Sequence, residues 1–358
     1  MKTVKFDKNH SKDFITELRK AVEEYFKKNN KTRFGNANMV FKSIFMLLLY
    51  FVPYTLAISG VITNNWLYWL LWVCMGVGMA GIGLSIMHDA NHGSYSKNKL
   101  INRLFGLTLN ILGGSAKNWR IQHNRLHHTF TNIHEMDPDV SPMGLLRFSP
   151  DAPLKKIHRL QYIYAWFFYG LMTLSWTFMK DFKDAVRYQK MGLYKQLKTS
   201  FAKEMTLIIA TRILYFAYMV VLPLIFMDIT WWQLIIGFLT VHFVAGTTLA
   251  LIFQLAHVME ETKFPLPEDG SVNNQWAAHQ LSTTLNFANN KKVFSWLIGG
   301  LNFQVEHHLF PHISHIHYSK IAPIVEKTAQ EFNMPYNSEN SFFRALASHG
   351  RMLYQLGR

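Results

Sequence analysis

The sequence predicts an all-α integral membrane protein with four transmembrane helices, interfacial helices, and a cytoplasmic helical cap that carries clustered histidines. Of the 358 residues, 49% are hydrophobic and only 16% are charged, whereas soluble domains average about 25% charged residues. Four long apolar segments interrupt the chain, and nearly all basic residues lie outside them. The composition excludes a disordered chain, and a single cysteine excludes an intramolecular disulfide framework and a cysteine-ligated cluster.

The polar N-terminal segment, residues 1–42, is expected to be cytoplasmic and to contain an amphipathic helix that packs on the domain or on the membrane. Ser11 is a candidate N-cap for this helix. Apolar residues recur there at helical spacing. They are Phe14, Ile15, Leu18, Ala21, Val22, Tyr25 and Phe26. The rest of the chain, residues 43–358, is expected to form a single membrane domain.

The four apolar segments each offer about 20 or more residues, which is enough to cross a hydrocarbon core of ~30 Å. The spans are predicted at residues 43–63, 66–87, 205–227 and 231–257. The cytoplasmic cap is then formed by residues 88–204 and 258–358.

The distribution of basic residues orients the chain. The loops at 63–65 and 228–230 carry no Lys or Arg, and Arg212 is the only basic residue inside a span, from which it is expected to extend toward the interface. By the positive-inside rule the other segments and both termini are cytoplasmic. Membrane orientation therefore accounts for the net charge of +15, and no nucleic-acid partner is expected.

Eight of the 17 histidines form a pattern next to the spans. Histidines at i and i+4 are neighbours on a helix and can converge on one metal ion or on two adjacent ions. Eight imidazoles exceed the needs of one ion, and imidazole suits Zn, Cu, Fe and Ni alike, so the spacing favours a dinuclear site without selecting the metal. The pattern comprises His88 and His92 in HDANH, His123, His127 and His128 in HNRLHH, His257 in FQLAH, and His307 and His308 in QVEHH.

Membrane topology adds a constraint, because His88 and His257 must reach the same compartment and an even number of crossings must separate them. The aromatic-rich segment 162–179 is therefore expected to lie in the interface, where Tyr and Trp are favoured. By the same reasoning, residues 102–114 are expected not to cross the membrane.

At these residues the sequence resembles the membrane fatty acyl desaturases. HDANH, HNRLHH and QVEHHLFP resemble the three histidine boxes of that family, and Gln304 in the third box is typical of its front-end group. The resemblance runs from about residue 40 to the C-terminus and is strongest to bacterial Δ6-type (linoleoyl) desaturases that lack a cytochrome b5 domain. No HPGG haem motif occurs in the chain.

The resemblance implies an O2-dependent enzyme that inserts a cis double bond into an acyl chain carried by a lipid or by CoA. It implies two non-haem iron ions bound by the eight histidines, with Gln304 as a further ligand or as a residue that orients one. It also implies a separate electron donor, ferredoxin or cytochrome b5. A bacterial inner membrane is the expected location, with the endoplasmic reticulum as the alternative. No substrate-binding residue is predicted.

Other side chains near the boxes are candidates for supporting roles. Metal-bound histidines commonly donate their second N–H to a carboxylate, which makes five acidic residues candidates. Trp119 is expected to pack near the second box, His242 to form a hydrogen bond inside the helix bundle, and His134 and His158 to lie at the surface. The acidic candidates are Asp89, Asp137, Asp139, Glu260 and Glu306.

Two alternatives stay open from the residues alone. A membrane hydroxylase or ketolase could use the same boxes, because the first hydrogen abstraction is shared. A haem-binding electron-transfer protein would also place histidines on membrane helices, but it needs axial histidines on facing helices within the bilayer.

Overall fold

The computed structural model describes residues 4–6, 12–62, 64–141, 144–272 and 274–358. Within these residues, four helices are long and apolar enough to cross a membrane, which confirms the predicted all-α membrane class. Two of them continue through a π-helical turn. They are α2 (Ala37–Ile58); α3 (Asn65–Gly81) with η1 (Ile82–Met87) and α4 (His88–His92); α13 (Phe201–Phe216) with η6 (Ala217–Val221) and α14 (Leu222–Phe226); and α15 (Trp231–His257).

Three of these helices differ in extent from the prediction. Helix α2 starts six residues before the predicted span, because the Asn36 side chain accepts the backbone N–H groups of Asn38 and Met39. Helix α13 starts at residue 201, directly after its N-cap residue Ser200. The second span runs on to His92 and stops only where Gly93 adopts a left-handed φ of 74°. The first histidine box is therefore the last turn of a membrane-crossing helix.

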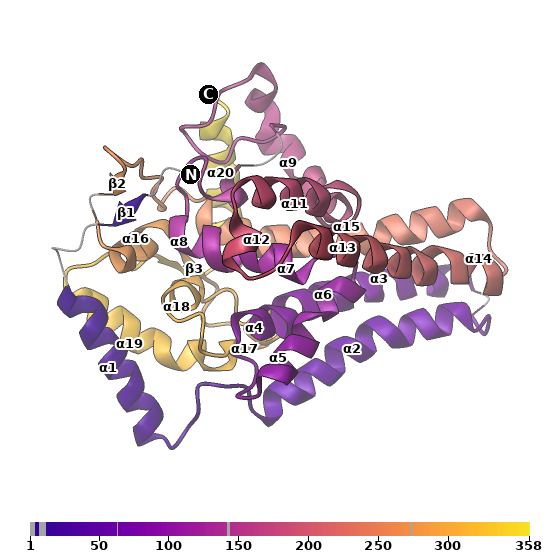
Figure 1. The fold of residues 1–358 in the computed structure, drawn as a ribbon, viewed down its shortest axis with the longest axis horizontal. Helices are drawn as coiled ribbons and strands as arrows, with labels where there is room; N and C mark the ends of the chain where they lie inside the picture. The colour runs from indigo at the N-terminus through magenta and orange to yellow at the C-terminus, as the bar shows by residue number, and fades with distance from the viewer. Residues whose placement is uncertain (1–3, 7–11, 63, 142–143, 273) are drawn as a thin grey trace.

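Helix α3 packs closely between α2 and α15 because glycines face both neighbours. A Cβ on Gly78 would lie 2.7 Å from the backbone nitrogen of Tyr50 in α2, and one on Gly76 would lie 2.9 Å from the carbonyl oxygen of Val241 in α15. Small residues allow this approach between membrane helices. The long helices extend to one side of the molecule in Figure 1, and the shorter helices gather at the other end with both marked termini.

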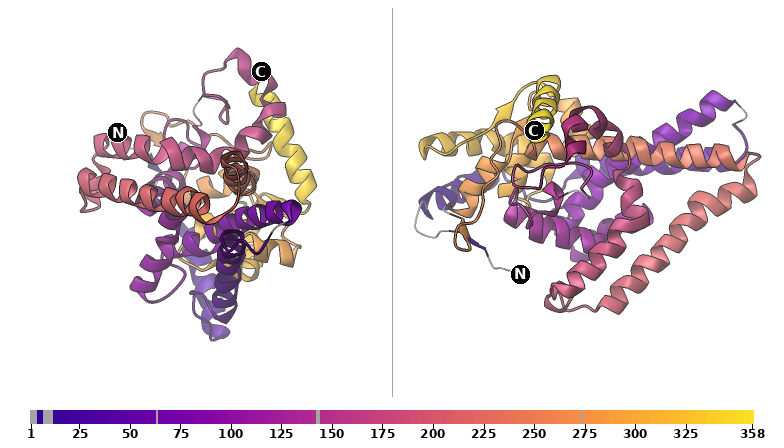
Figure 2. Two further views of the ribbon diagram at one scale, coloured as in Figure 1. Left: turned by 90° about the vertical axis from the view of Figure 1, so that its right-hand side faces the viewer. Right: turned by 90° about the horizontal axis from the view of Figure 1, so that it is seen from above.

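The shorter helices form the cap, which Figure 2 shows from two further directions. Those between the second and third spans are α5 (Lys99–Gly106), α6 (Thr108–Ile111), α7 (Ala116–Trp119), η2 (Arg120–His127), α8 (His128–Phe130), η3 (Pro138–Val140), η4 (Lys156–Leu160), α9 (Gln161–Gly170), α10 (Met172–Ser175), η5 (Trp176–Lys180), α11 (Asp181–Lys190) and α12 (Leu193–Gln196). Those after the fourth span are α16 (Trp276–Thr283), α17 (Lys292–Leu297), α18 (Gln304–Leu309), η7 (His315–His317), α19 (Tyr318–Glu331) and α20 (Phe342–Leu356).

Two short parallel strand pairs tie distant segments together. Strand β1 (Lys5–Phe6) pairs with β2 (Ser271–Val272), and β3 (Asn286–Phe287) pairs with β4 (Ser338–Glu339). In register, Lys5 faces Ser271 and Asn286 faces Ser338. The second pair fixes the chain just before the third histidine box.

The N-terminal amphipathic helix is present as α1 (Lys12–Lys28). Its apolar face, with Phe14, Leu18 and Val22 buried, packs into one core with α18 and α19. The helix therefore packs on the domain, next to the third box. Ser11, the expected cap, lies outside the described residues.

The two segments expected not to cross the membrane are broken into short pieces. Residues 102–114 cover the end of α5, all of α6 and the turn after it, and these helices of 8 and 4 residues are too short to span. Residues 162–179 form α9, α10 and η5, and the chain packs along α15, where a Cβ on Gly246 would lie 2.6 Å from the Gly170 carbonyl oxygen. The interfacial placement of this segment stays a prediction.

The expectation that Arg212 extends to the interface is wrong. Its side chain is buried, and its Nη2 pairs with the carboxylate of Asp181. The guanidinium also donates to three backbone carbonyl groups, so it finds its partners inside the protein.

Candidate metal centre

The first box is placed by α4, the continuation of α3 and η1. No Gly or Pro with helix-ending geometry occurs between the π-helical turn and Gly93, so His88 and His92 stay one helical turn apart on the same face. Their rings lie 4.7 Å apart between centroids, and His88 is buried.

The second box lies on η2 and the start of α8. The π-helical geometry of η2 is rare and is frequent at functional sites. His123, His127 and His128 are all buried. The stretch begins after α7, whose N-cap Ser115 accepts the backbone N–H of Asn118.

The third box is helix α18, in which all six residues are buried. The side-chain oxygen of Asn286, in β3, accepts the backbone N–H of Val305 at 2.9 Å, which satisfies one of the free donors in the first turn. His257 is the last residue of α15, and its ring meets the second and third boxes: the centroids of His257 and His127 are 4.7 Å apart, and those of His257 and His308 are 4.8 Å apart.

The structure brings all eight predicted histidines into one cluster, in which His92 is half-buried and the other seven are buried. The first histidine group is His88, His92, His123 and His307, and the second is His127, His257 and His308. In each group the candidate ligand atoms lie within 4.8 Å of one another. His128 lies between the groups, close to both His307 and His308.

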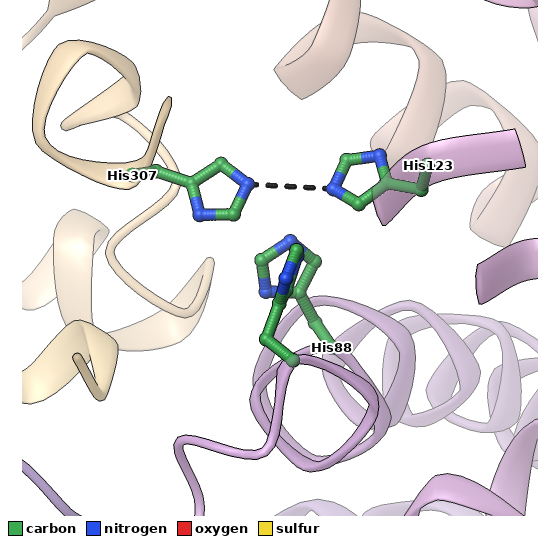
Figure 3. Close-up of side chains that lie close together, drawn as sticks. His88, His123 and His307 are labelled. Atoms are coloured by element: carbon green, nitrogen blue, oxygen red, sulfur yellow. Dashed lines mark hydrogen bonds between the residues drawn. The ribbon is translucent and has the colours of Figure 1, made fainter. Parts of the chain in front are cut away.

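Ring nitrogens from different segments converge at the centre of the first group. Nε2 of His128 lies 3.2 Å from that of His123 and 3.0 Å from that of His307. Nε2 of His123 and Nε2 of His307 are 3.3 Å apart, and Figure 3 shows these two rings pointing at each other above His88. Two nitrogens bound at ~2.0–2.1 Å to one ion lie roughly 3 Å apart, so the spacing fits ligation.

The opposite nitrogen of four histidines is held by a partner. Nδ1 of His127 lies 3.0 Å from Asp137 Oδ2, and Nδ1 of His308 lies 2.7 Å from Gln280 Oε1. Nδ1 of His257 lies 3.2 Å from the Thr283 carbonyl oxygen, and Nδ1 of His307 lies 3.2 Å from the Tyr318 hydroxyl. Such contacts fix the ring orientation and turn Nε2 toward the centre.

Electrostatics differ between the histidines. Burial and neighbouring imidazoles hold the pKa of His123, His128, His307 and His308 well below the usual value, so these rings are neutral and their lone pairs are free. Burial also lowers the pKa of His127, but the carboxylates of Asp137 and Asp139 outweigh burial and raise it to about 9.

The donor chemistry of the cluster fits a metal ion. Several buried ring nitrogens have no hydrogen-bond partner among the described residues, which is costly for a protein interior. Neutral imidazole nitrogens that point at a shared centre are well suited to bind a metal ion. The unpaired atoms are Nε2 of His88, His92, His127, His257 and His308, and Nδ1 of His88 and His128.

Asp89 lies beside the first box, at the end of a chain of contacts that starts at Lys42. The Lys42 ammonium lies 2.7 Å from Nε2 of His315, and Nδ1 of His315 lies 3.0 Å from Asp89 Oδ2. Because an ammonium can only donate, His315 must carry its proton on Nδ1, facing Asp89. The same oxygen accepts the Ser314 hydroxyl at 2.7 Å, while Oδ1 lies 3.7 Å from Nδ1 of His88.

Two polar candidates of the third box, Gln304 and Glu306, also form hydrogen bonds to groups other than the box histidines. Gln304 donates to the Leu301 carbonyl oxygen at 2.8 Å and also lies beside His257. The Glu306 carboxylate accepts from Asn286 Nδ2 at 2.8 Å and from the Tyr336 hydroxyl at 2.9 Å rather than from a histidine, and burial raises its pKa to about 7.

Glu260 also lies away from the boxes, because it pairs with Arg351 at 2.7 Å. The expected support from Asp139 is weaker than that from Asp137: its Oδ2 lies 3.4 Å from Nδ1 of His127, and its Oδ1 accepts from Gln122 Nε2.

The other histidines among the described residues lie outside the two groups. His242 forms the expected hydrogen bond inside the bundle, with its Nε2 2.8 Å from the Tyr215 hydroxyl. The surface expectation for His158 is wrong: its side chain is buried, and it contacts the Lys155 N–H and the Gly144 carbonyl oxygen. His279 is buried in α16, and His349 is buried between Tyr169 and Val258.

An apolar pocket adjoins the first histidine group. It lies between η1, the turn after α6, η5 and α15. The Trp119 indole forms part of its wall and stacks on His123, with the ring centroids 4.4 Å apart. Phe253, on the other side, lies 6.0 Å from the same imidazole. The pocket is narrow, and its apolar side chains lie next to His123 of the first histidine group.

Comparisons with known proteins agree with this geometry. The family model for fatty acid desaturases matches residues 64–340. The chain belongs to the fatty acid desaturase family. It is 36% identical to an acyl-lipid (8-3)-desaturase of Physcomitrium patens, over 99% of this chain and 74% of that protein. It is 33% identical to two sn-1 linoleoyl-lipid 6-desaturases: that of Arthrospira platensis, over 94% of this chain and 90% of the relative, and that of Synechocystis, over 95% and 94%.

The desaturase contains supporting residues that sequence reasoning missed. Lys42, Gln280, His315 and Tyr318 contact histidines or Asp89, and none of them was predicted to have this supporting role. The signal available in the sequence was the polarity of Lys42 at the edge of an apolar run.

Proposed function

We propose that this desaturase holds two iron ions at the histidine groups and inserts a cis double bond into the acyl chain of a membrane lipid, in the front-end manner. The main support for this proposal is that two groups of mostly buried and mostly neutral histidines lie next to an apolar pocket. The first group would hold one ion and the second group the other, with His128 between them. The relatives named as acyl-lipid and linoleoyl-lipid desaturases favour a glycerolipid over CoA as carrier.

Bound iron would supply the O2 activation needed to remove hydrogen from an unactivated methylene. The overall reaction takes one O2, two electrons and two protons, and it releases two waters. The side chains position the reactants: Trp119 and Phe253 confine the acyl chain beside His123, and the apolar wall excludes water. The Nδ1 contacts keep the imidazoles in the tautomer that offers Nε2.

The proposed location is a bacterial inner membrane with both termini on the cytoplasmic side, as the charge distribution indicates. Electrons would come from a separate acidic donor, ferredoxin or cytochrome b5. A hollow lined by Lys117, Arg120 and Arg125 lies on the same segment as the second box and offers positive charge to an anionic partner or headgroup.

The test is lipid analysis of cells that express the chain and are fed linoleate. Wild type should yield a species with two fewer hydrogens, and His127→Ala should abolish it. His312→Ala is the matched control, because His312 is an exposed histidine near the third box. A product that gains an oxygen instead would make the protein a hydroxylase, and a Soret band in purified protein would support the haem alternative.

A further inference from the structure

Arg212 binds the protein backbone with its whole guanidinium group. Nε donates to the Thr177 carbonyl oxygen at 2.9 Å, Nη1 to that of Gly114 at 3.2 Å and Nη2 to that of Trp176 at 3.3 Å. Nη2 also pairs with the carboxylate of Asp181. A buried charge in a membrane-crossing helix is costly and marks a functional role by default.

The three carbonyl groups share a location, because Gly114, Trp176 and Thr177 all line the apolar pocket. Gly114 belongs to the turn after α6, whereas the other two belong to η5. Arg212 therefore links two separate walls of the pocket without lining the pocket itself. The Thr177 hydroxyl adds a direct bond between them, since it donates to the Gly113 carbonyl oxygen at 3.2 Å.

His242, in the fourth span, also contacts this wall. Its Nδ1 lies 3.0 Å from the Thr173 hydroxyl, which in turn donates to the His242 carbonyl oxygen. Thr173 also lines the pocket, whereas Arg212 and His242 do not. Both residues thus contact the wall and leave the pocket apolar.

We propose that Arg212, paired with Asp181, is a positioning residue that fixes the distance between these walls and so determines which carbon–carbon bond is oxidised. This rests on the proposed function, because it requires the acyl chain to occupy the pocket. A misplacement of ~1 Å can cost about 10²-fold in rate. Neighbouring carbons of an acyl chain are separated by a similar distance, so a small shift of the wall would present a different bond.

The test uses the double variant Arg212→Met with Asp181→Leu. Replacing a buried ion pair by apolar residues of similar volume is often neutral for stability, whereas removing one partner leaves an unpaired charge. The double variant should therefore fold while losing all three carbonyl contacts. Arg212→Lys is the second variant, because it keeps the charge but one ammonium cannot reach three carbonyl groups. Lys203→Gln, an exposed change on the same helix, is the control.

The readouts are the double-bond position, determined by mass spectrometry of derivatised lipids, and the thermal midpoint and iron content of purified protein. We expect the fraction of product with a displaced double bond to rise at least tenfold in the double variant and in Arg212→Lys, and to stay unchanged in Lys203→Gln. Lower activity with an unchanged double-bond position in both variants would overturn the proposal. Arg212 would then have a structural role only.

A pocket-filling variant separates this proposal from the proposed function. Leu249 lines the pocket, so Leu249→Trp should reduce product or displace the double bond. If Leu249→Trp changes neither, the acyl chain does not use the pocket, and the assignment of the pocket fails. If Leu249→Trp changes the product and the Arg212 variants do not, only the role of Arg212 fails.

Discussion

Oδ2 of Asp137 lies 3.0 Å from Nδ1 of His127 and accepts the backbone N–H of Asn132 at 2.9 Å. The other oxygen accepts the backbone N–H of Asp139 at 2.9 Å. The carboxylate is thus fixed by two backbone N–H groups and by His127. It therefore orients a single imidazole, that of His127. Asp137 is the best-anchored support of the second histidine group.

The first prediction concerns this contact. Asp137→Asn should weaken iron binding by about 10–100-fold, because the amide loses the charge that makes His127 a strong ligand. Iron retained per chain should be measured against increasing chelator. Asp139→Asn is the matched control and should have a smaller effect, since Asp139 lies farther from His127 and is partly exposed. An equal effect of the two changes would contradict the ranking.

A second prediction concerns Lys42, which acts on the first group through His315. Lys42→Met keeps the bulk but removes the donor that fixes the His315 tautomer, so His315 no longer needs to face Asp89 with a proton. We expect iron affinity to fall about tenfold, with the loss confined to the ion proposed for the first histidine group. Lys28→Met, at an exposed site on α1, should leave iron binding unchanged. An iron titration of Lys42→Met that matches the wild type would contradict a role of Lys42 in iron binding.

Removal of metal should lower stability. An ion that binds the folded chain at 1,000 times its Kd stabilises it by about 4 kcal/mol, and the unpaired imidazole nitrogens would be left buried without it. Chelation should therefore lower the thermal midpoint in detergent, and iron should restore it. A chain in which His88, His123 and His127 are all changed to Ala should show no response to chelator.

The pH dependence of stability should include a contribution from His349. Burial lowers its pKa to about 4, against an ordinary value of 6.5. Above pH 6.5 both states are neutral and His349 contributes nothing. As the pH falls from 6.5 to 4 only the unfolded chain takes up the proton, so stability falls, by about 3 kcal/mol in full.

The variant His349→Gln removes this titration while keeping groups that can bond Val258 and Tyr169. Its thermal midpoint should change less than that of the wild type between pH 7 and pH 5. Parallel curves for the two proteins would show that His349 is protonated equally in both states.

Local spacing made most of the centre predictable. Histidines four residues apart must share a helix face, and apolar runs of 20 residues must find a membrane, so the clusters and spans could be located without a structure. The extent of the second span was missed because its end depends on the backbone of Gly93 rather than on hydropathy. The Asn36 cap was a readable signal for the start of α2.

Contacts between distant segments could not be predicted. Asp89 meets His315, and Arg212 meets Asp181, through packing that no local pattern encodes. Burial of His158 likewise depends on the loop at Gly144 folding over it. Sequence analysis therefore located the histidines but misjudged Arg212, His158 and the partners of Glu260 and Glu306.

Both histidine groups include a residue of α18, which follows the last span in the chain. During synthesis, neither group can be completed until residues 307 and 308 have left the ribosome, by which time all four membrane helices have been made. An ion captured with full coordination therefore marks a chain whose insertion is finished. A copy truncated before residue 307 would therefore lack a ligand from each group.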